Sequence, residues 1–349
     1  MKLRKNALAG IALAATAALG LAACGSNAST PASSDSAAGS GDGITVYNAQ
    51  HESLTKEWID AFTKETGIKV TVRQGGDTEM SNQIVQEGAA SPADVFLTEN
   101  SPAMTQVENA GLFADVDKAT IDQVPAEFRP STGKWTGIAA RSTVFVYDKS
   151  KISEDKLPKS MLDLAKPEWK GKWAASPTGA DFQAIVSALL ELKGEAATEE
   201  WLKGMKDNFK AYKGNSTAMK AVNAGEVDGA LIYHYYYYGD QAKTGENSKN
   251  VTPYYFKNQD PGAFLSVSGG GVLKSSKHAA DAQAFLKFIT GKKGQEILKT
   301  GTSFEYAVAS QVNSNDKLVP IKELQAPTVD PAKLNSTKVT ELMTKAGLL

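Results

Sequence analysis

Cysteine is nearly absent from this sequence of 349 residues, because the single one, Cys24, lies close to the N-terminus. Residues 25–349 therefore cannot supply a thiol nucleophile, a disulfide, or thiolate ligands for zinc or an iron–sulfur cluster. A folded part of about 300 residues without disulfides must be held together by its hydrophobic core, and that length suffices for two domains of ordinary size.

The N-terminal apolar run is short for a membrane span. Lys2, Arg4 and Lys5 precede a short apolar stretch over residues 7–19, and Leu21-Ala22-Ala23-Cys24 closes it. A membrane helix needs roughly 20 apolar residues, whereas a basic start, a short apolar centre and small residues are typical of an export signal. The last four residues resemble a bacterial lipobox. That resemblance implies that residues 1–24 are a lipoprotein signal peptide and that Cys24 becomes the lipidated N-terminus, with no transmembrane segment in the mature protein.

Strong net charge is lacking as well. The formal net charge of −1 becomes −4 when residues 1–24, which carry three basic and no acidic side chains, are removed. The lysines are scattered rather than clustered, so we expect no binding to nucleic acid. Residues 25–43 are rich in Ser, Ala and Gly and contain almost nothing large and apolar, which predicts a flexible tether between the lipid anchor and the folded part.

No period of 20–50 residues repeats, which argues against a solenoid. Short β-branched runs instead alternate with segments of helical spacing. We expect strands at 44–47, 68–73, 93–97, 135–147, before 176, 229–232 and 264–273, and helices at 53–67, 80–88, 102–111, 182–190, 201–209, 215–225 and from about 279 and 294 onward. This alternation predicts an α/β fold with a largely parallel sheet in each domain.

Two polar residues follow neighbouring strands of this pattern. His51 comes just after the strand at 44–47, and Glu99 just after the strand at 93–97. The carboxyl ends of strands form the edge at which open α/β sheets bind ligands. Alone, His51 would be read as a turn histidine and Glu99 as a cap of the next helix, so their candidacy as ligands depends on their pairing.

Aromatic residues make up only 8% of the chain, yet five of its 11 tyrosines lie in the run Tyr-His-Tyr-Tyr-Tyr-Tyr at 233–238. Consecutive aromatics fit neither a helix nor a strand period. The run can be a packing element or a flat surface on which a ligand stacks. Its phenol oxygens can also serve as ligands for a hard, highly charged cation.

A turn of small residues, Ser176-Pro177-Thr178-Gly179-Ala180, leads into the helical pattern that begins at Phe182. Free backbone N–H groups at a helix N-terminus can bind an anion, although most such turns only cap a helix.

Seven stretches combine into a more specific pattern. They are Val46-Tyr47-Asn48-Ala49-Gln50-His51, Ala93-Asp94-Val95-Phe96-Leu97-Thr98-Glu99, Arg141-Ser142, Trp169-Lys170-Gly171-Lys172, Asn215-Ser216, Ala230-Leu231-Ile232 with Tyr235-Tyr236, and Gln259-Asp260-Pro261-Gly262-Ala263. Together they resemble the periplasmic ferric-ion-binding proteins, the substrate-binding components of iron ABC importers. The resemblance covers almost all of residues 44–349.

This resemblance implies a two-lobed periplasmic-binding-protein type II fold, with two β-strand crossovers at the hinge and a ligand cleft between the lobes. The N-terminal lobe would comprise residues 44–140 plus about 264–349, and the C-terminal lobe about 141–263. The implied partners are ferric ion, an ABC permease and its ATPase, and the protein is expected to act as a monomer. Its location would be outside the cytoplasm, on the outer face of the membrane or in the periplasm.

The resemblance also implies the binding site. The positions that match the iron ligands of the family are His51, Glu99, Tyr235 and Tyr236. A synergistic anion such as phosphate or carbonate commonly completes the coordination, and the matching residues are Thr178, Gly179, Ala180 and Asn215. Arg141 can hold this anion or carboxylates, or can bridge strands.

The chemistry of these four side chains agrees with Fe(III). Two phenolates, a carboxylate and an imidazole form a hard, mostly anionic set of ligands. The phenols must ionise well below their usual pKa near 10, so acid should weaken binding. Adjacent helical residues point about 100° apart, and Tyr235 and Tyr236 can therefore share an ion only at an irregular turn or a helix start.

The chain also departs from the family pattern. Tyr233 and His234 stand where relatives often carry small amides, and Asn100 stands where a longer glutamine is common. These departures put the anion site in doubt and make Tyr233 and His234 alternative ligands.

Two other functions compete with iron capture. A protein of the same fold can bind a small organic ligand such as thiamine, a polyamine or a phosphonate, with the aromatic cluster stacking on it. An exported metal-dependent hydrolase is the other. The sequence has no His-Glu-x-x-His, no nucleophile elbow and no serine with matching His and Asp partners, so we expect no enzymatic activity.

Overall fold

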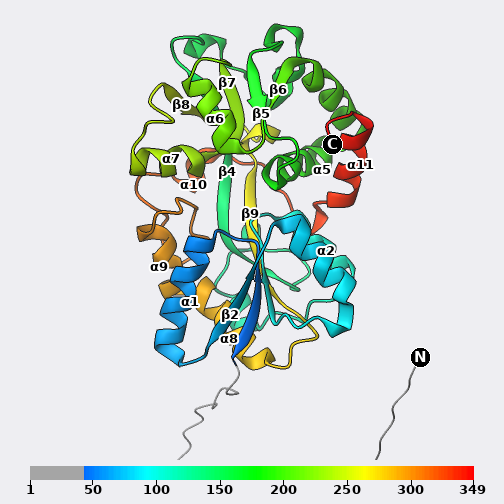
Figure 1. Cartoon of the computed structure of the whole chain (residues 1–349), viewed down its shortest axis with the longest axis vertical. Helices are drawn as coiled ribbons and strands as arrows, with labels where there is room; N and C mark the ends of the chain where they lie inside the picture. The colour runs from blue at the N-terminus through cyan, green and yellow to red at the C-terminus, as the bar shows by residue number, and fades with distance from the viewer. Residues whose placement is uncertain (1–42) are drawn as a thin grey trace, which may run out of the picture. The chain divides into compact units, whose positions relative to one another are not determined.

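The computed structural model describes residues 43–349 (Figure 1). The predicted signal peptide, Cys24 and all of the predicted tether except its last residue lie outside the described residues. The strands are β1 Ile44–Asn48, β2 Val70–Gln74, β3 Val95–Leu97, β4 Thr136–Asp148, β5 Trp173–Ala175, β6 Phe209–Ala211, β7 Gly229–Tyr233, β8 Val251–Tyr254 and β9 Leu265–Val272. No helix within residues 43–349 is long and apolar enough to cross a membrane.

The helices occupy the intervals between these strands. The α-helices are α1 Glu52–Thr66, α2 Asp77–Glu87, α3 Ser101–Asn109, α4 Lys118–Ile121, α5 Ala180–Asn208, α6 Asn215–Asn223, α7 His234–Lys243, α8 Ala279–Thr290, α9 Lys292–Thr300, α10 Ile321–Leu324 and α11 Ser336–Lys345. The 3-10 helices are η1 Gly88–Ala90, η2 Ala126–Phe128, η3 Glu154–Lys156, η4 Met161–Ala165, η5 Pro167–Trp169, η6 Pro261–Ala263 and η7 Pro331–Lys333. Short elements such as β6, β8, α4 and α10 were not predicted from the sequence.

Within the described part of the chain, the strands form one mixed sheet in the order β2-β1-β3-β9-β4-β7-β5-β6, with β8 also paired to β4. The group β2-β1-β3 and the group β7-β5-β6 are each parallel, as the sequence predicts. The prediction of a largely parallel sheet is wrong for β4 and β9, whose pairings are antiparallel. These two strands carry the chain between the parallel groups, so antiparallel pairing is how the groups are joined.

β4 is the longest strand, and all 13 of its residues are buried. Its first part pairs with β9 as far as Ser142, opposite Leu265, and its second part pairs with β7 from Thr143, opposite Tyr233. β9 continues to β3. Figure 1 shows β4 and β9 running between a first lobe, built on β1–β3, and a second lobe, built on β5–β7. The predicted two-lobed fold with two β-strand crossovers is confirmed.

The first lobe has helices on both faces of its sheet, because side chains of a strand alternate between faces. In β1, Ile44 and Val46 pack with buried residues of α1, α8 and α9, whereas Tyr47 packs with α2 and α3. The second lobe repeats the arrangement, since Val144 of β4 packs toward α6 and Phe145 toward α5.

Helix ends follow local sequence rules. α1 ends at Gly67, which adopts the left-handed conformation (φ 76°) that the sequence predicts for this cap. The two helices predicted at 182–190 and 201–209 are parts of α5, which is broken at Gly194 (φ 80°). α6 begins at Asn215, but its N-cap is Gly214 and no side chain caps it.

The C-terminal segment touches elements of both lobes. The hydroxyl of Thr105 in α3 donates to the carbonyl oxygen of Pro331 in η7 (3.0 Å), and α11 packs against α5. The lobe boundaries deduced from the resemblance stay a prediction.

We predict that Gly137→Ala destabilises the protein. Gly137 lies at the register shift of β4, and a Cβ there would be 2.1 Å from the carbonyl oxygen of Phe128 and 2.9 Å from Val267 Cγ1. Backbone must move to relieve such a clash, at a cost of about 1–3 kcal/mol. Urea unfolding measures this change. Gly239→Ala in α7 is the control, because its Cβ meets nothing within 4 Å and it should leave stability unchanged or raise it. Equal stability of the Gly137→Ala variant and the parent would contradict the prediction.

Candidate metal centre

His51 and Glu99 meet at the edge of the first lobe's sheet. His51 follows β1 and is the N-cap of α1, and Glu99 follows β3, which pairs with β1. His51 Nε2 lies 3.2 Å from Glu99 Oε1, and each side chain is about one quarter exposed, at 25% and 24%. The sequence-based pairing of these two residues is therefore borne out in space.

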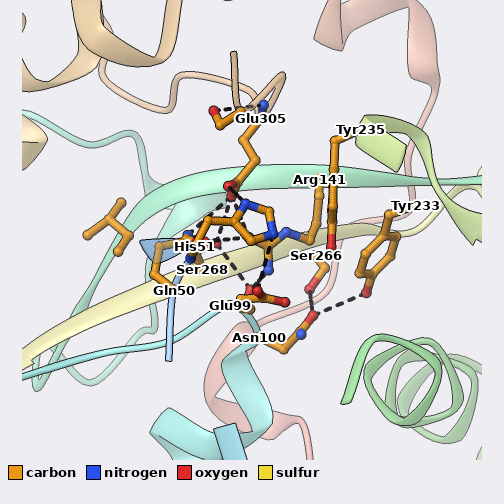
Figure 2. Close-up of polar contacts among 12 residues, drawn as sticks. Gln50, His51, Glu99, Asn100, Arg141, Tyr233, Tyr235, Ser266, Ser268 and Glu305 are labelled. Atoms are coloured by element: carbon orange, nitrogen blue, oxygen red, sulfur yellow. Dashed lines mark hydrogen bonds and ion pairs between the residues drawn. The ribbon is translucent and has the colours of Figure 1, made fainter. Parts of the chain in front are cut away.

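The two central tyrosines of the run lie at the start of a helix, the position in which adjacent tyrosines are expected from the sequence to be able to share an ion. Tyr233 ends β7 and is the N-cap of α7, so Tyr235 and Tyr236 lie in the first helical turn. Their ring centroids are 4.3 Å apart. The ring centroids of Tyr235 and His51 are 4.9 Å apart in an edge-to-face arrangement, which brings the second lobe against the first (Figure 2).

Asp181 is the functional candidate that the sequence reasoning missed. It is the second residue of α5 and is 5% exposed. Its Oδ2 accepts hydrogen bonds from Tyr236 Oη (2.9 Å), Tyr235 Oη (3.2 Å) and Asn215 Nδ2 (2.8 Å). A signal was present in the sequence, since Asp181 directly follows the turn 178–180 proposed for anion binding.

Asn100 links the two lobes through all of its amide atoms. Its Nδ2 donates to Asp77 Oδ2 (3.1 Å) in the first lobe and to Asp181 Oδ1 (3.0 Å) in the second. Its Oδ1 accepts from Ser266 Oγ (3.0 Å) and Tyr233 Oη (3.3 Å). A buried amide that satisfies two donors and two acceptors fixes the position of each partner. Asn100 thus orients the carboxyl group of Asp181.

A fully buried ion pair lies behind His51. Glu305 and Arg141 are both unexposed, and Glu305 Oε2 accepts from Arg141 Nη2. Glu305 Oε1 lies 2.9 Å from His51 Nδ1, so the imidazole is placed between the carboxyl groups of Glu305 and Glu99 (Figure 2). Arg141 also donates to the backbone carbonyl of Glu99 and to Gln50 Oε1 (3.3 Å).

The titratable groups divide into two classes. Burial, with the nearby charge of Asp181, raises the pKa of Glu99 to about 8, and burial raises the pKa of Asp77 to about 7. Burial and the charge of Asp181 hold the pKa of the Tyr235 and Tyr236 phenols well above 10. The two phenols and the carboxyl group of Glu99 therefore keep their protons at neutral pH.

The buried ion pair behaves in the opposite way. Burial alone would raise the pKa of Glu305, but Arg141 and His51 outweigh it and lower that pKa to about 2. Burial disfavours the His51 imidazolium, yet the charge of Glu305 outweighs it and raises the pKa of His51. Glu305 therefore stays ionised at neutral pH.

The other members of the tyrosine run have different surroundings. Tyr233 is fully buried, and its hydroxyl donates to Asn100 Oδ1 and to the backbone oxygen of Asp181 (3.3 Å each). His234 is also fully buried, accepts from the Ser142 backbone N–H (3.1 Å), and stacks on Tyr306 at 4.7 Å. Burial lowers the pKa of His234 to about 4, so its ring stays neutral. Tyr237 and Tyr238 pack edge to face at 5.4 Å.

The residues predicted for the anion lie near the phenols but are partly engaged. Gly179 is the N-cap of α5, Ala180 is its first residue, and Thr178 precedes them. Asn215 donates to Asp181 rather than standing free. The terminal nitrogens of Arg141 are occupied by contacts with the Glu99 carbonyl oxygen, Gln50 and Glu305. Arg141 Nε is buried and has no hydrogen-bond partner among the described residues.

The donor set of the site is rich in oxygen. No group of three or more His, Cys, Asp or Glu side chains that could hold a metal ion lies within residues 43–349, so the site as a metal centre depends on its phenol oxygens. Two phenols, two carboxyl groups and one imidazole converge there, a combination suited to a hard trivalent ion and poorly suited to soft metals.

Known proteins resemble the chain over its whole length. The Fe(3+)-binding periplasmic protein of Serratia marcescens is 66% identical over 349 residues, which is 100% of both chains. The major ferric iron-binding protein of Neisseria meningitidis serogroup A is 38% identical over 331 residues, 94% of this chain and 97% of that one. The crystal structure of iron-bound HitA from Pseudomonas aeruginosa superposes with a TM-score of 0.82 at 42% identity, covering 87% of this chain and 99% of that one.

A family comparison gives the same result. Residues 90–335 match the family described as bacterial extracellular solute-binding protein, and this range includes Glu99, Asp181, Tyr235 and Tyr236. The fold, with two lobes joined by β4 and β9, agrees with the iron-bound structure just described. The chain belongs to the bacterial extracellular solute-binding proteins.

Proposed function

We propose that this protein captures ferric ion outside the cytoplasm and delivers it to an ABC importer. The observation that carries the proposal is the convergence of two adjacent phenol oxygens, Tyr235 and Tyr236, on one carboxylate beside the His51–Glu99 pair. Such an arrangement suits an ion that can displace phenolic protons. The relatives described as ferric-ion-binding proteins support the same ligand.

The four ligands that we propose are His51, Glu99, Tyr235 and Tyr236. The first two belong to one lobe and the last two to the other, so the ion can bind all four only when the lobes are closed. An ion that binds the closed form better shifts the population toward it. The permease and ATPase would then recognise the closed protein, which we propose acts as a monomer held by a lipid on Cys24.

We also propose that Asp181 is a fifth ligand and takes the place of an exogenous anion. Its Oδ2 already lies within 3.2 Å of both phenol oxygens. A bound phosphate or carbonate would have to displace this carboxylate from Asn215, which was itself predicted to hold the anion.

The relatives described as ferric-ion-binding proteins support binding rather than catalysis. An organic ligand stacked on the tyrosines is the less favoured alternative, because the faces of Tyr235 and Tyr236 lie near each other and near His51.

Replacing both proposed tyrosine ligands should abolish iron binding. The double variant Tyr235→Phe/Tyr236→Phe loses two anionic ligands, so its affinity for ferric ion should fall by more than about 100-fold. The visible phenolate-to-iron charge-transfer band, which we expect in the parent protein after addition of a ferric salt, should vanish. Tyr237→Phe is the matched control from the same helix and should keep the band. A parent protein that stays colourless and shows no change in melting temperature with ferric salt would overturn the proposed function.

Iron affinity should rise with pH between about 5.5 and 7.5. Two phenols must lose their protons, and the pKa of Glu99, raised to about 8, means that a third proton is held by the His51–Glu99 pair. Binding should therefore release about three protons per ion, and log K should climb with that slope. Competition with a chelator of known pH dependence measures it. An affinity that is flat over this range would contradict ligation by phenols.

Asp181 can be tested by its effect on anion dependence. The parent protein should bind ferric ion equally well with and without phosphate or carbonate. Asp181→Ala should bind weakly without an added anion and should be partly restored by one, because it opens the place beside Asn215. Asp207→Ala, an exposed acid at the other end of α5, controls for charge. A parent protein that needs an added anion would contradict the fifth ligand and favour the synergistic anion predicted from the sequence.

A further inference from the structure

Glu305 is a buried carboxylate that none of the roles proposed so far uses. We propose that it is a positioning residue for iron binding, which fixes the His51 ring so that Nε2 faces the ion. This inference rests on the proposed function, because it assumes that His51 is a ligand.

The backbone brings Glu305 to the centre from far away in the sequence. It follows α9, and its neighbour Tyr306 exchanges backbone hydrogen bonds with Ala140 of β4, at 3.0 and 2.8 Å. The preceding residue, Phe304, has φ 55°, a left-handed conformation that is unfavourable for a non-glycine residue. Phe304 is nevertheless held there by stacking on Tyr238 of α7. The backbone is thus strained at Phe304, directly before Glu305, where the chain reaches β4.

The two oxygens of the Glu305 carboxylate differ in their contacts, because Oε1 meets His51 as an ion pair and not as a hydrogen bond of regular geometry. Oε1 is 2.9 Å from His51 Nδ1. Oε2 accepts from Arg141 and from Gln50 Nε2 (3.2 Å), and Ser268 Oγ lies 3.4 Å away. These partners come from the turn after β1, from β4 and from β9, so the carboxylate cannot rotate without breaking several buried contacts.

The contact with His51 determines which ring nitrogen is available. A neutral imidazole has one N–H and one acceptor, and a carboxylate at Nδ1 selects the form with the proton there. The lone pair then lies on Nε2, which points toward Glu99 Oε1, a proposed ligand of the same ion. A carboxylate behind a metal-binding histidine also makes the imidazole a better donor.

Glu305 has a second effect, through Arg141. The Arg141 guanidinium lies 5.5 Å from the centre of the Tyr235 ring and is fully buried. An unpaired positive charge so close to the site would repel a trivalent cation. Glu305 neutralises that charge through its buried ion pair with Arg141.

A double-mutant cycle separates positioning of His51 from general support of the fold. Affinity for ferric ion, supplied as ferric nitrilotriacetate and competed with a chelator, is measured for the parent, Glu305→Gln, His51→Ala and the double variant. We expect Glu305→Gln to lower affinity about 10- to 100-fold in the parent and at least about fivefold less in the His51→Ala background, where only the unpaired charge of Arg141 still weakens binding. Glu296→Gln, an exposed acid on α9, is the matched control and should change nothing.

Three results would overturn the inference. An equal loss in both backgrounds would mean that Glu305 acts on the fold and not through His51. Full affinity in Glu305→Asp, which keeps the charge beside Arg141 but withdraws from His51, would assign Glu305 to Arg141 alone. A His51→Ala variant with unchanged affinity would remove the ligand that Glu305 is proposed to position. A parent protein that binds no ferric ion would instead contradict the proposed function itself.

A measurement on the unaltered protein covers the case in which Glu305→Gln fails to fold. In protein loaded with Ga(III), a diamagnetic hard trivalent ion, nitrogen-15 NMR should find His51 with a hydrogen-bonded proton on Nδ1 and none on Nε2. A bare Nδ1 would overturn the inference.

Discussion

The structure depends on the protonation and pairing of several carboxyl groups that lie near the junction of the two lobes. Glu99, Asp77, Asp181 and Glu305 are gathered around the junction of the lobes, and Arg141 is the buried cation among them. Like charges repel strongly in a medium of low dielectric constant. Buried carboxyl groups of the site therefore keep protons that they would lose in water. Burial is the main cause of the raised pKa of Glu99, about 8, and of Asp77, about 7, and the charge of Asp181 adds to both.

These shifts make the metal-free protein sensitive to pH in a defined direction. A carboxyl group whose folded pKa lies above its unfolded value stabilises the fold below the unfolded pKa, and that contribution is lost as pH rises through about 7 for Asp77 and about 8 for Glu99. Glu305 has the reverse sign, because its contribution is present above the unfolded pKa and is lost as pH falls toward about 2. A cation that enters the site replaces the protons and relieves the repulsion.

The sequence could predict which side chains the strands and local patterns bring together. His51 and Glu99 each follow a strand of the period-2 pattern, so their meeting at one edge follows from parallel pairing. Tyr235 and Tyr236 were distinguished by resemblance, and their place at a helix start follows from the end of β7 at Tyr233. The two-lobed fold was likewise implied by resemblance, while the antiparallel pairing of β4 and β9 was not anticipated from alternation alone.

The sequence reasoning missed Asp181 and Glu305 for different physical reasons. Asp181 looked like an ordinary acidic residue in the first turn of a helix, where the helix dipole favours a carboxylate. Glu305 lies in a segment without regular structure, and its contacts with His51 and Arg141 span 254 and 164 residues of chain. Periodicity describes which face of an element is buried, and it carries no information about contacts between a loop and a distant turn.

Asp181 finally explains how one site can serve two states. Without metal, its Oδ2 accepts hydrogen bonds from both phenols, and Asn100 holds its other oxygen across the lobes. If the phenols ionise, the same oxygen faces two negative charges instead of two donors, and the closed arrangement becomes unfavourable unless a cation lies among them. With the proposed ligands, iron and protons would compete for one set of oxygens, and protonation would restore the hydrogen bonds that the ion replaces.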